Sequence, residues 1–477
     1  MKHQPFLFAS IMLLLAFLAD YLLLEELIGM SYSVFLAIFY GTFFYLFRKN
    51  SFTNKQIGGL VFASVWLLSI SYTITGLPFF NVLNLLLIPV LVFIHLVLIT
   101  GPSAMAWHTP AFLLFLGRKI AQMFRYGIRL VRLNGGKTKN SLDKTVYGTI
   151  RKVAIGILIA TPLLFVVLSL LTSADMQFAR MLASFPGELL NFNTDLIFRG
   201  IRVAIIAIVF LLFFKTVWKK PKQPVQALHD LPRSWDHIIT ITVLVLVNLV
   251  YLLFTVVQFR YFFSGSLEAG FSYAEYARRG FFELILVTII NFAILLTSLT
   301  FVKRHTSIVM KGMLTLLIGF SGIMLISSFM RLMLYEEAYG FTRLRILAHS
   351  FMIFLAIILL YTLFKVWIER LSLARFYLIS ALFYYVGLNI IGIDQIIVSN
   401  NIDRYEQTGK IDIAYLGLLS DAAVPELVAL YEEHPEIPGL SIVLKERQNQ
   451  LATEQPAWQS YSFVREKAKE SLEQFKF

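Results

Sequence analysis

The chain has 477 residues, of which 58% are hydrophobic and only 15% are charged, and its mean hydropathy is +0.72. An ordinary soluble domain is about 45–50% apolar and about 25% charged, so this composition excludes a soluble protein and predicts an all-α, polytopic helical membrane protein. The formal charge of +13 does not indicate nucleic-acid binding here, because Lys and Arg gather in the cytoplasmic loops of membrane proteins. The chain has no cysteine, which excludes disulfides, thiol catalysis and thiolate metal sites.

The amino-terminal stretch "MKHQPFLFASIMLLLAFLAD" has the basic tip and apolar core of a signal peptide, but no small-x-small cleavage site follows it. We therefore expect it to be retained as the first membrane-spanning helix. Apolar runs of about 20 residues, the length needed to cross a bilayer as a helix, recur along the chain. They predict eleven spans, near residues 6–24, 30–47, 57–75, 80–100, 150–171, 196–217, 237–257, 281–302, 308–330, 346–366 and 374–397.

The third and fourth predicted spans are joined by "TGLPFF", a short Gly-Pro turn. A re-entrant pair is an alternative for these two segments, and it leaves the sidedness of later loops unchanged. One set of alternate connections, which begins at the amino terminus, carries far more Lys and Arg than the other set. This asymmetry predicts a cytoplasmic amino terminus and an extracytoplasmic carboxyl terminus.

The inner loop 101–149 contains "FLGRKIAQMFRYGIRLVRL", in which basic residues recur at helical spacing beside an apolar stripe. A basic amphipathic helix of this kind suits an anionic inner leaflet, and a specific protein partner for the arginines is the alternative. The predicted membrane-surface residues are Arg118, Arg125, Arg129 and Arg132.

The sequence divides into a membrane domain, residues 1–397, and a polar carboxyl-terminal region, residues 398–477, which we expect to be small, helical and extracytoplasmic. In this region "DIAYLGLLSDAAVPELVALYEEHPEI" indicates helix, turn and helix, and Pro425 is acceptable in a first turn. "AWQSYSFVREKAKESLEQF" predicts a further amphipathic helix.

Two charged clusters lie in connections that we expect to face outward. In "FSYAEYARRGFFEL", Glu275, Arg279 and Glu283 share one helical face and Arg278 lies beside it. Ser272 and Glu275 also form a capping box, which explains Glu275 without any ligand.

The second cluster is "MLYEEAYGFTRLR", preceded by Arg331. Gly340 allows a bend there, and arginines can hold a carboxylate or phosphate through paired hydrogen bonds. Paired carboxylates can serve as acid and base or hold a cation or proton. The alternative is a structural network that ties the helix ends together. The candidate ligand-binding residues of this cluster are Arg331, Tyr335, Glu336, Glu337, Arg343 and Arg345.

Inside the spans, Asp394 of "GLNIIGIDQIIV" is a candidate proton or cation site, although its place near the outer end also fits a hydrated residue. Asp20, Glu25 and Glu26 indicate a solvated face near the first outer turn. We expect three polar residues to hydrogen-bond between helices rather than bind ligands: Asn248, Asn291 and His349.

Several familiar signatures fail in this sequence. "NGGKTK" lacks the upstream glycine of a phosphate-binding loop, the histidines have no metal-ligand spacing, and "IGFSGI" is not a nucleophile elbow. The sequence therefore predicts no cofactor, no metal site and no nucleic-acid partner.

Three stretches in this order, "FSYAEYARRGFFEL", "LYEEAYGFTRLR" and "DIAYLGLLSDAAVPELVAL", resemble a family of bacterial polytopic membrane proteins known only as a domain of unknown function, DUF4153, with DUF4173 as its neighbour. The resemblance covers most of the chain. It implies a bacterial cell-membrane protein with outward Arg/Glu/Tyr clusters, and it implies no substrate and no catalytic residue.

Three classes of function fit these features. The first is a protein that binds or transports a small anionic or lipid-like ligand at its outer face. The expected partners are the lipid bilayer, anionic lipids of the inner leaflet and a membrane or envelope protein. The second is an envelope enzyme that acts on a lipid-linked substrate with Glu336 or Glu337 as base. The third is a membrane sensor or scaffold that contacts a partner protein.

Overall fold

The computed structural model describes residues 5–102, 105–137, 194–219, 235–262, 281–302, 307–453 and 457–474. Within these ranges nine helices are long and apolar enough to cross a membrane. The chain is thus an all-α membrane protein, as its composition predicts. The predicted span 150–171 and the residues Glu275, Arg278 and Arg279 lie outside the described residues.

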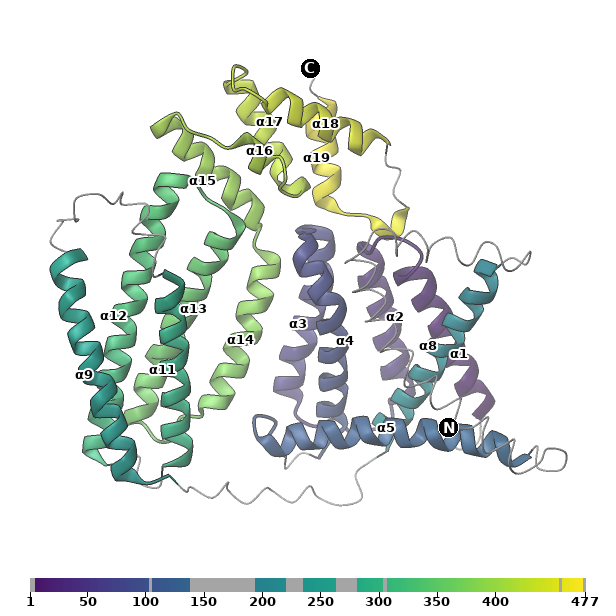
Figure 1. Cartoon of the computed structure of the whole chain (residues 1–477). Coiled ribbons are helices and arrows are strands. Elements are labelled where there is room, and N and C mark those ends of the chain that lie inside the picture. Colours follow the sequence, from purple (N-terminus) through teal and green to yellow (C-terminus); the bar gives the residue numbers. More distant parts are fainter. Residues whose placement is uncertain are drawn as a thin grey trace. The chain divides into compact units, whose positions relative to one another are not determined.

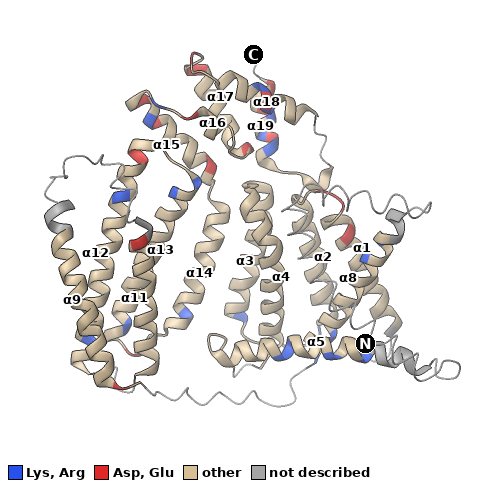
Figure 2. Ribbon diagram, in the orientation of Figure 1, with Lys and Arg blue, Asp and Glu red and all other residues tan. Residues whose placement is uncertain are grey.

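The chain divides into two compact units, one of residues 1–61 and 91–225 and the other of residues 62–90 and 226–477. The division falls within two helices, α3 (Lys55–Ile74) and α4 (Pro78–Thr100), so each of them contributes to both units. Figure 2 shows that charged residues are sparse along the middle of the long helices and more frequent near their ends.

The first unit contains α1 (Pro5–Leu23), α2 (Met30–Leu46), α5 (Pro110–Lys137) and α8 (Thr194–Trp218) (Figure 1). The aromatic residues of α2 recur every four positions and so form one face that packs on α8. Phe39 lies 5.5 Å from Phe214, and Phe47 lies 4.8 Å from Trp218, measured between ring centroids.

The prediction of a solvated face near the first outer turn is wrong for Asp20. Its side chain is fully buried, accepts a hydrogen bond from Arg202 and lies 3.0 Å from Nε of Arg199 in an ion pair, and both arginines lie near the start of α8. Glu25 and Glu26 are exposed as predicted. A buried carboxylate is stable only with such partners, and these lie far away in the sequence.

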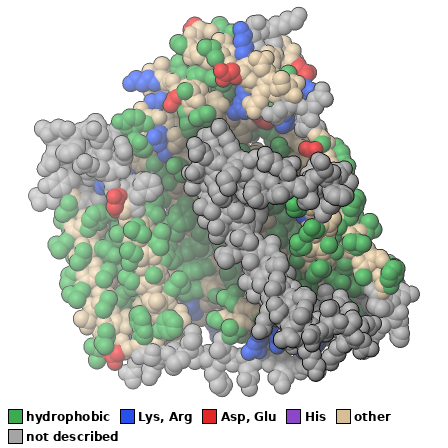
Figure 3. Space-filling view, turned by 45° about the vertical axis from the view of Figure 1, so that its right-hand side comes forward, with side chains coloured by type: hydrophobic (Ala, Val, Ile, Leu, Met, Phe, Trp, Pro, Cys, Tyr) green, Lys and Arg blue, Asp and Glu red, His purple; other side chains and the backbone are tan. Residues whose placement is uncertain are grey.

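The second unit contains the membrane helices α9 (His237–Phe262), α11 (Phe281–Phe301), α12 (Ile308–Tyr339), α13 (Arg343–Trp367) and α14 (Leu373–Ile390) (Figure 1). Their apolar core includes Leu244, Leu295, Leu314, Leu325 and Met352. On the face drawn in Figure 3, hydrophobic side chains cover the flanks of the helices, whereas charged side chains gather over the carboxyl-terminal region.

That carboxyl-terminal region, which we call the cap, consists of short helices. They are α15 (Ile393–Thr408), α16 (Ile413–Leu416), the 3₁₀ turn η1 (Asp421–Ala423), α17 (Val424–Glu433), α18 (Leu440–Thr453), the 3₁₀ turn η2 (Trp458–Ser460) and α19 (Phe463–Glu473). The helix–turn–helix prediction is confirmed, with Pro425 in the first turn of α17. Leu416, Val424, Leu440, Leu444 and Leu472 form the core of the cap.

The prediction of one continuous span over 374–397 is wrong. Helix α14 ends at Ile390 and α15 begins at Ile393, with Gly392 between them. Gly392 has φ −70° and ψ 74°, so the chain leaves the helical conformation there and turns between the two helices. The apolar run continues past the turn because Ile393 and Ile397 pack into the core of the cap rather than against lipid.

Candidate functional site

The motif between Met333 and Arg345 is mostly helical. Helix α12 continues to Tyr339, and only residues 340–342 connect it to α13. Gly340 makes the predicted bend with φ +80°, a conformation that favours glycine. Its N–H donates to the Glu336 carbonyl at 2.7 Å and so satisfies one of the free carbonyls at the end of α12.

Two residues of α15 hold this connection in place. The Asn401 amide accepts from the N–H of Phe341 and donates to its carbonyl, both at 3.0 Å. The Arg404 guanidinium donates to the carbonyls of Glu337 and Ala338, both at 2.8 Å. Free carbonyls at a helix end favour a cation, so Arg404 caps α12.

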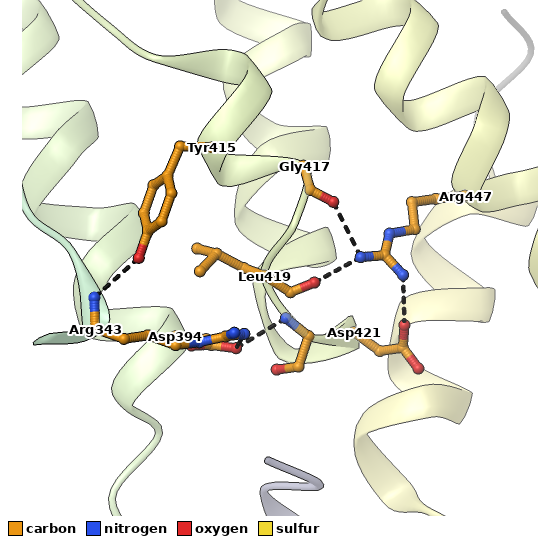
Figure 4. A network of polar contacts seen from close by, with 8 residues as sticks. Arg343, Asp394, Tyr415, Gly417, Leu419, Asp421 and Arg447 are labelled. Carbon is orange, nitrogen blue, oxygen red and sulfur yellow. Dashed lines mark hydrogen bonds and ion pairs between the residues drawn. The ribbon is translucent and has the colours of Figure 1, made fainter. Parts of the chain in front are cut away.

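The pair of Arg343 and Asp394 joins α13 to α15 (Figure 4). Nε of Arg343 donates to Oδ1 of Asp394 at 2.7 Å, and its terminal nitrogen donates to Oδ2 at 2.6 Å. The Ser420 N–H donates to the same Oδ2 at 2.8 Å, and the Arg343 N–H donates to the Tyr415 hydroxyl at 2.8 Å. This is the bidentate geometry in which arginine binds a carboxylate most strongly.

Asp394 is fully buried, although it belongs to the cap and not to a membrane span. Burial raises the pKa of its carboxyl, but hydrogen bonds from Arg343 and Ser420 and the charge of Arg343 outweigh burial and hold the pKa below its usual 3.8. Asp394 is therefore ionised at neutral pH, and its contacts are those of a structural anchor.

The turn between α16 and η1 is held from its other side by Arg447 of α18 (Figure 4). One terminal nitrogen donates to the carbonyls of Gly417 at 3.0 Å and Leu419 at 2.6 Å, and the other lies 3.7 Å from Asp421. Arg343 and Arg447 thus fix the two sides of one loop of the cap.

Arg345 has a different environment from Arg343. Its guanidinium lies 4.2 Å from the ring centroid of Tyr335 and donates to the Gly340 carbonyl. The Tyr335 ring lies 5.0 Å from the Tyr339 ring, and Tyr339 is 55% exposed. Among the described residues no carboxylate forms an ion pair with Arg345. Arg345 therefore presents a positioned, half-buried cation with donors to spare.

Glu336 is buried between α12 and α13, and its Oε2 lies 3.1 Å from Nδ1 of His349. Its other oxygen, Oε1, and the buried hydroxyl of Ser328 have no hydrogen-bond partner in the described part of the chain. An unsatisfied buried oxygen costs about 1–3 kcal/mol, and more for a charged group, so such atoms normally have water or a ligand beside them. Arg331 is buried one helical turn before Tyr335.

The structure therefore divides the predicted residues into groups. Arg331, Tyr335, Glu336 and Arg345 lie around the end of α12 and the start of α13, whereas Arg343 and Asp394 form a separate pair. Glu337 is exposed, and Glu283 is exposed in the first turn of α11. Sequence reasoning missed Asn401, Arg404 and Arg447, because no local pattern marks them. It also missed the role of Tyr415 as the acceptor for the Arg343 N–H, although Tyr415 lies within the motif "DIAYLGLL".

The polar residues inside the membrane helices bond between helices, as predicted. The Asn248 amide donates to the Met313 carbonyl at 3.0 Å. The Asn291 amide donates to the Ser321 hydroxyl at 2.8 Å and accepts from the Tyr251 hydroxyl at 2.6 Å. These bonds join α9, α11 and α12 in the way expected where water is absent.

A family model described as "Domain of unknown function (DUF4153)" matches residues 62–430, about three-quarters of the chain. No curated protein and no solved structure matches the chain. The matched range includes all the candidate site residues from Glu275 to Asp394. The chain belongs to the DUF4153 family.

Proposed function

For this member of the DUF4153 family, we propose that it binds a small anionic or lipid-like ligand in a bacterial cell membrane. The binding site is the group formed by Arg331, Tyr335, Glu336, Arg345 and Tyr339, which we call the α12–α13 cluster. It lies at the extracytoplasmic end of its helices, the amino terminus is cytoplasmic and the cap is extracytoplasmic. The excess of Lys and Arg in one set of alternate loops supports this orientation.

The observation that carries the proposal is the contrast between two arginines only two residues apart. Arg343 binds the carboxylate of Asp394 through Nε and one terminal nitrogen, so its charge is already matched by a fully buried carboxylate. Arg345 is held on the Tyr335 ring and retains free donors. A guanidinium fixed in this way binds phosphate or carboxylate at a smaller entropic cost than a mobile one.

Neighbouring side chains support a ligand with an apolar part. Leu344, next to Arg345 in the chain, is 79% exposed, and Met333, two positions before Tyr335, is 45% exposed. The exposed Tyr339 adds an aromatic ring beside Tyr335. Aromatic residues with a polar tip are typical of the membrane interface, where lipid headgroups lie.

An envelope enzyme that acts on a lipid-linked substrate is the second candidate. The buried pair of Glu336 and His349 favours it, because a carboxylate with one unsatisfied oxygen and an imidazole as partner can act as a general base. In that case the α12–α13 cluster binds the same class of headgroup and Glu336 performs the proton transfer.

Binding is tested by the thermal stability of purified protein in a nonionic detergent. The probes are dioctanoyl phosphatidylglycerol, dioctanoyl phosphatidylcholine and inorganic phosphate, and the variants are Arg345→Gln and, as a matched control, Arg370→Gln. Arg370 is exposed after the other end of α13. A ligand that binds only the folded state raises Tm.

We expect phosphatidylglycerol to raise the Tm of the wild type and of Arg370→Gln, but not that of Arg345→Gln. A response to inorganic phosphate alone identifies the anionic group as sufficient, and a response to phosphatidylglycerol alone shows that the acyl chains are needed. An equal rise with phosphatidylcholine, or a full rise in Arg345→Gln, refutes the proposal.

The orientation has its own test, since the chain has no cysteine. Single cysteines at Leu344 and Arg370 mark the two ends of α13, and both positions are exposed. We expect a membrane-impermeant maleimide to label Leu344→Cys and not Arg370→Cys in intact cells. The reverse pattern would place the α12–α13 cluster on the cytoplasmic side.

A further inference from the structure

Helix α5 is fastened to the end of α8 by one buried face. Phe112, Phe115 and Lys119 of α5 are all buried. Nζ of Lys119 donates to the carbonyls of Thr216 at 2.9 Å and Lys219 at 2.8 Å, where α8 ends. Carbonyls in the last turn of a helix have no partner within the helix, so this lysine satisfies the end of α8 and fixes α5 to it.

The contact extends along α5. A Cβ at Gly127 would lie 3.3 Å from the Leu212 side chain, so a small residue allows the two helices to approach there. Nζ of Lys215 and of Lys219 lie 5.2 Å and 5.6 Å from the ring centroid of Tyr126. Because Lys119 and Tyr126 are seven residues apart, they share one face of α5. Among the described positions of α5, residues 113, 118, 120, 124, 125 and 129 lie off this face and are exposed, and we call this part of the helix its open side.

The open side of α5 has an apolar sector. Leu113, Ile120 and Phe124 are spaced by seven and four residues and so lie in one row. They are 68%, 45% and 64% exposed. Single exposed apolar residues are common on proteins, but a row of three large ones along a helix indicates a surface that is covered by another phase or molecule.

A second row, of arginines, runs along another part of the open side, well around the helix from the apolar sector. Arg118, Arg125 and Arg129 are spaced by seven and four residues in the same way, and all three are exposed. Within the described ranges no carboxylate pairs with any of them. The Arg132 side chain lies outside the described residues.

The direction of α5 fits a membrane surface. Figure 1 shows α5 running crosswise to α8, whose residues Phe198–Trp218 are long and apolar enough to span a membrane. Since Lys119 ties α5 to the last turn of that span, α5 lies at the level where the hydrocarbon core gives way to headgroups. A crosswise helix at this level meets hydrocarbon on one side and lipid phosphates on the other.

We infer that the open side of α5 binds the surface of an anionic phospholipid bilayer. The apolar sector of Leu113, Ile120 and Phe124 enters the acyl-chain boundary, and the arginine row binds lipid phosphates. The charge of the row selects anionic over zwitterionic lipid, because basic residues near a membrane are drawn to its negative surface potential. This inference concerns the first unit and does not depend on the ligand proposed for the α12–α13 cluster.

The test uses nitroxide spin labels, since every labelled cysteine is the only one in the chain. Leu113→Cys and Phe124→Cys report on the apolar sector, and Arg118→Cys and Arg125→Cys report on the arginine row. The full-length protein is placed in nanodiscs of phosphatidylcholine alone or of phosphatidylcholine with phosphatidylglycerol. Collision with oxygen reports contact with acyl chains, and collision with a water-soluble nickel chelate reports contact with water.

We expect the labels at 113 and 124 to be reached by oxygen and shielded from nickel, and the labels at 118 and 125 to show the opposite preference. We also expect the label at 124 to lie deeper when phosphatidylglycerol is present. That dependence should be lost when Arg118, Arg125 and Arg129 are replaced by Gln and kept when they are replaced by Lys.

Two results overturn the inference. If nickel reaches 113 and 124 as readily as 118 and 125, the open side of α5 faces water. If neither reagent reaches 113 and 124, protein covers the apolar sector, and a partner or a second copy of the chain is the occupant. A label at 124 that responds equally to both lipid compositions refutes the selection of anionic lipid.

Discussion

Loss of Arg343 and loss of the Asp394 charge should destabilise the cap by different amounts. The Asp394 side chain is fully buried, whereas the Arg343 side chain is 38% exposed. In Arg343→Gln the carboxylate stays buried with the Ser420 N–H as its remaining strong donor. In Asp394→Asn the guanidinium can turn toward water. Removal of the arginine should therefore destabilise the cap more than removal of the aspartate charge.

The magnitudes follow from that difference in exposure. Removing one partner of a buried ion pair costs about 3–5 kcal/mol, and the retained bond from Ser420 favours the lower end, about 3 kcal/mol, for Arg343→Gln. Because the Arg343 side chain is 38% exposed, water can solvate its charge, and Asp394→Asn should lower the stability of the cap by only about 1 kcal/mol. With about 1.4 kcal/mol for each factor of ten, local opening should become about 150-fold and about fivefold more frequent.

The assay is the rate of thiol labelling at Ala423→Cys. Ala423 is 1% exposed in the core of the cap, so the cysteine reacts only when the cap opens. Leu418→Cys, at a position that is 75% exposed, is the control whose labelling should not change. Equal acceleration in the two charge variants, or a larger one in Asp394→Asn, would refute the reasoning from burial.

Three further outcomes follow from other contacts. The pKa of Asp394 is lower in the folded state than its usual value of 3.8. Its contribution to the stability of the cap is therefore complete above pH 3.8 and is lost as the pH falls through the lower folded pKa. Amide exchange in the cap, corrected for its intrinsic pH dependence, should accelerate in that acid range in the wild type and not in Asp394→Asn. Asn84→Leu should lower the free energy of unfolding by about 2 kcal/mol, because the buried amide of Asn84 hydrogen-bonds to two polar residues of α14. The measurement is the denaturant concentration at the midpoint of unfolding, which should fall. Gly340→Ala should lower Tm more than Gly409→Ala: both glycines have positive φ, but only at Gly340 would a Cβ lie 2.6 Å from the Asn401 side chain.

The membrane helices could be predicted because lipid imposes one requirement on the backbone, which a helix of about 20 apolar residues meets by itself. The same reasoning failed at 374–397, where the apolar residues after Gly392 pack within the cap. Hydropathy records that a residue avoids water, and it does not distinguish lipid from a protein core.

The candidate residues were found by the concentration of charge, but their roles depend on partners distant in sequence. Arg343 and Asp394 are 51 positions apart, and Asp20 and Arg202 are 182 apart. Two arginines in one motif, Arg343 and Arg345, were equivalent in the sequence. Only the fold shows that one is paired with a buried carboxylate and the other lies on a tyrosine ring.

The cap restricts how the helices of the second unit can move. It is joined to the end of α12 by Arg404, to the start of α13 by Asp394, and to the end of α3 by Ser462, whose hydroxyl donates to the Thr73 carbonyl at 3.2 Å. Three helix ends are thus tied together on one side of the membrane. The opposite ends of α12 and α13 are joined, within the described residues, by two exposed contacts: the ion pair of Lys311 and Glu369, and a hydrogen bond from the Trp367 indole to the Thr315 hydroxyl. Any rocking of these helices should pivot about the tied ends, with the widest excursion at the far ends. A gate in this unit would then open toward the side away from the cap.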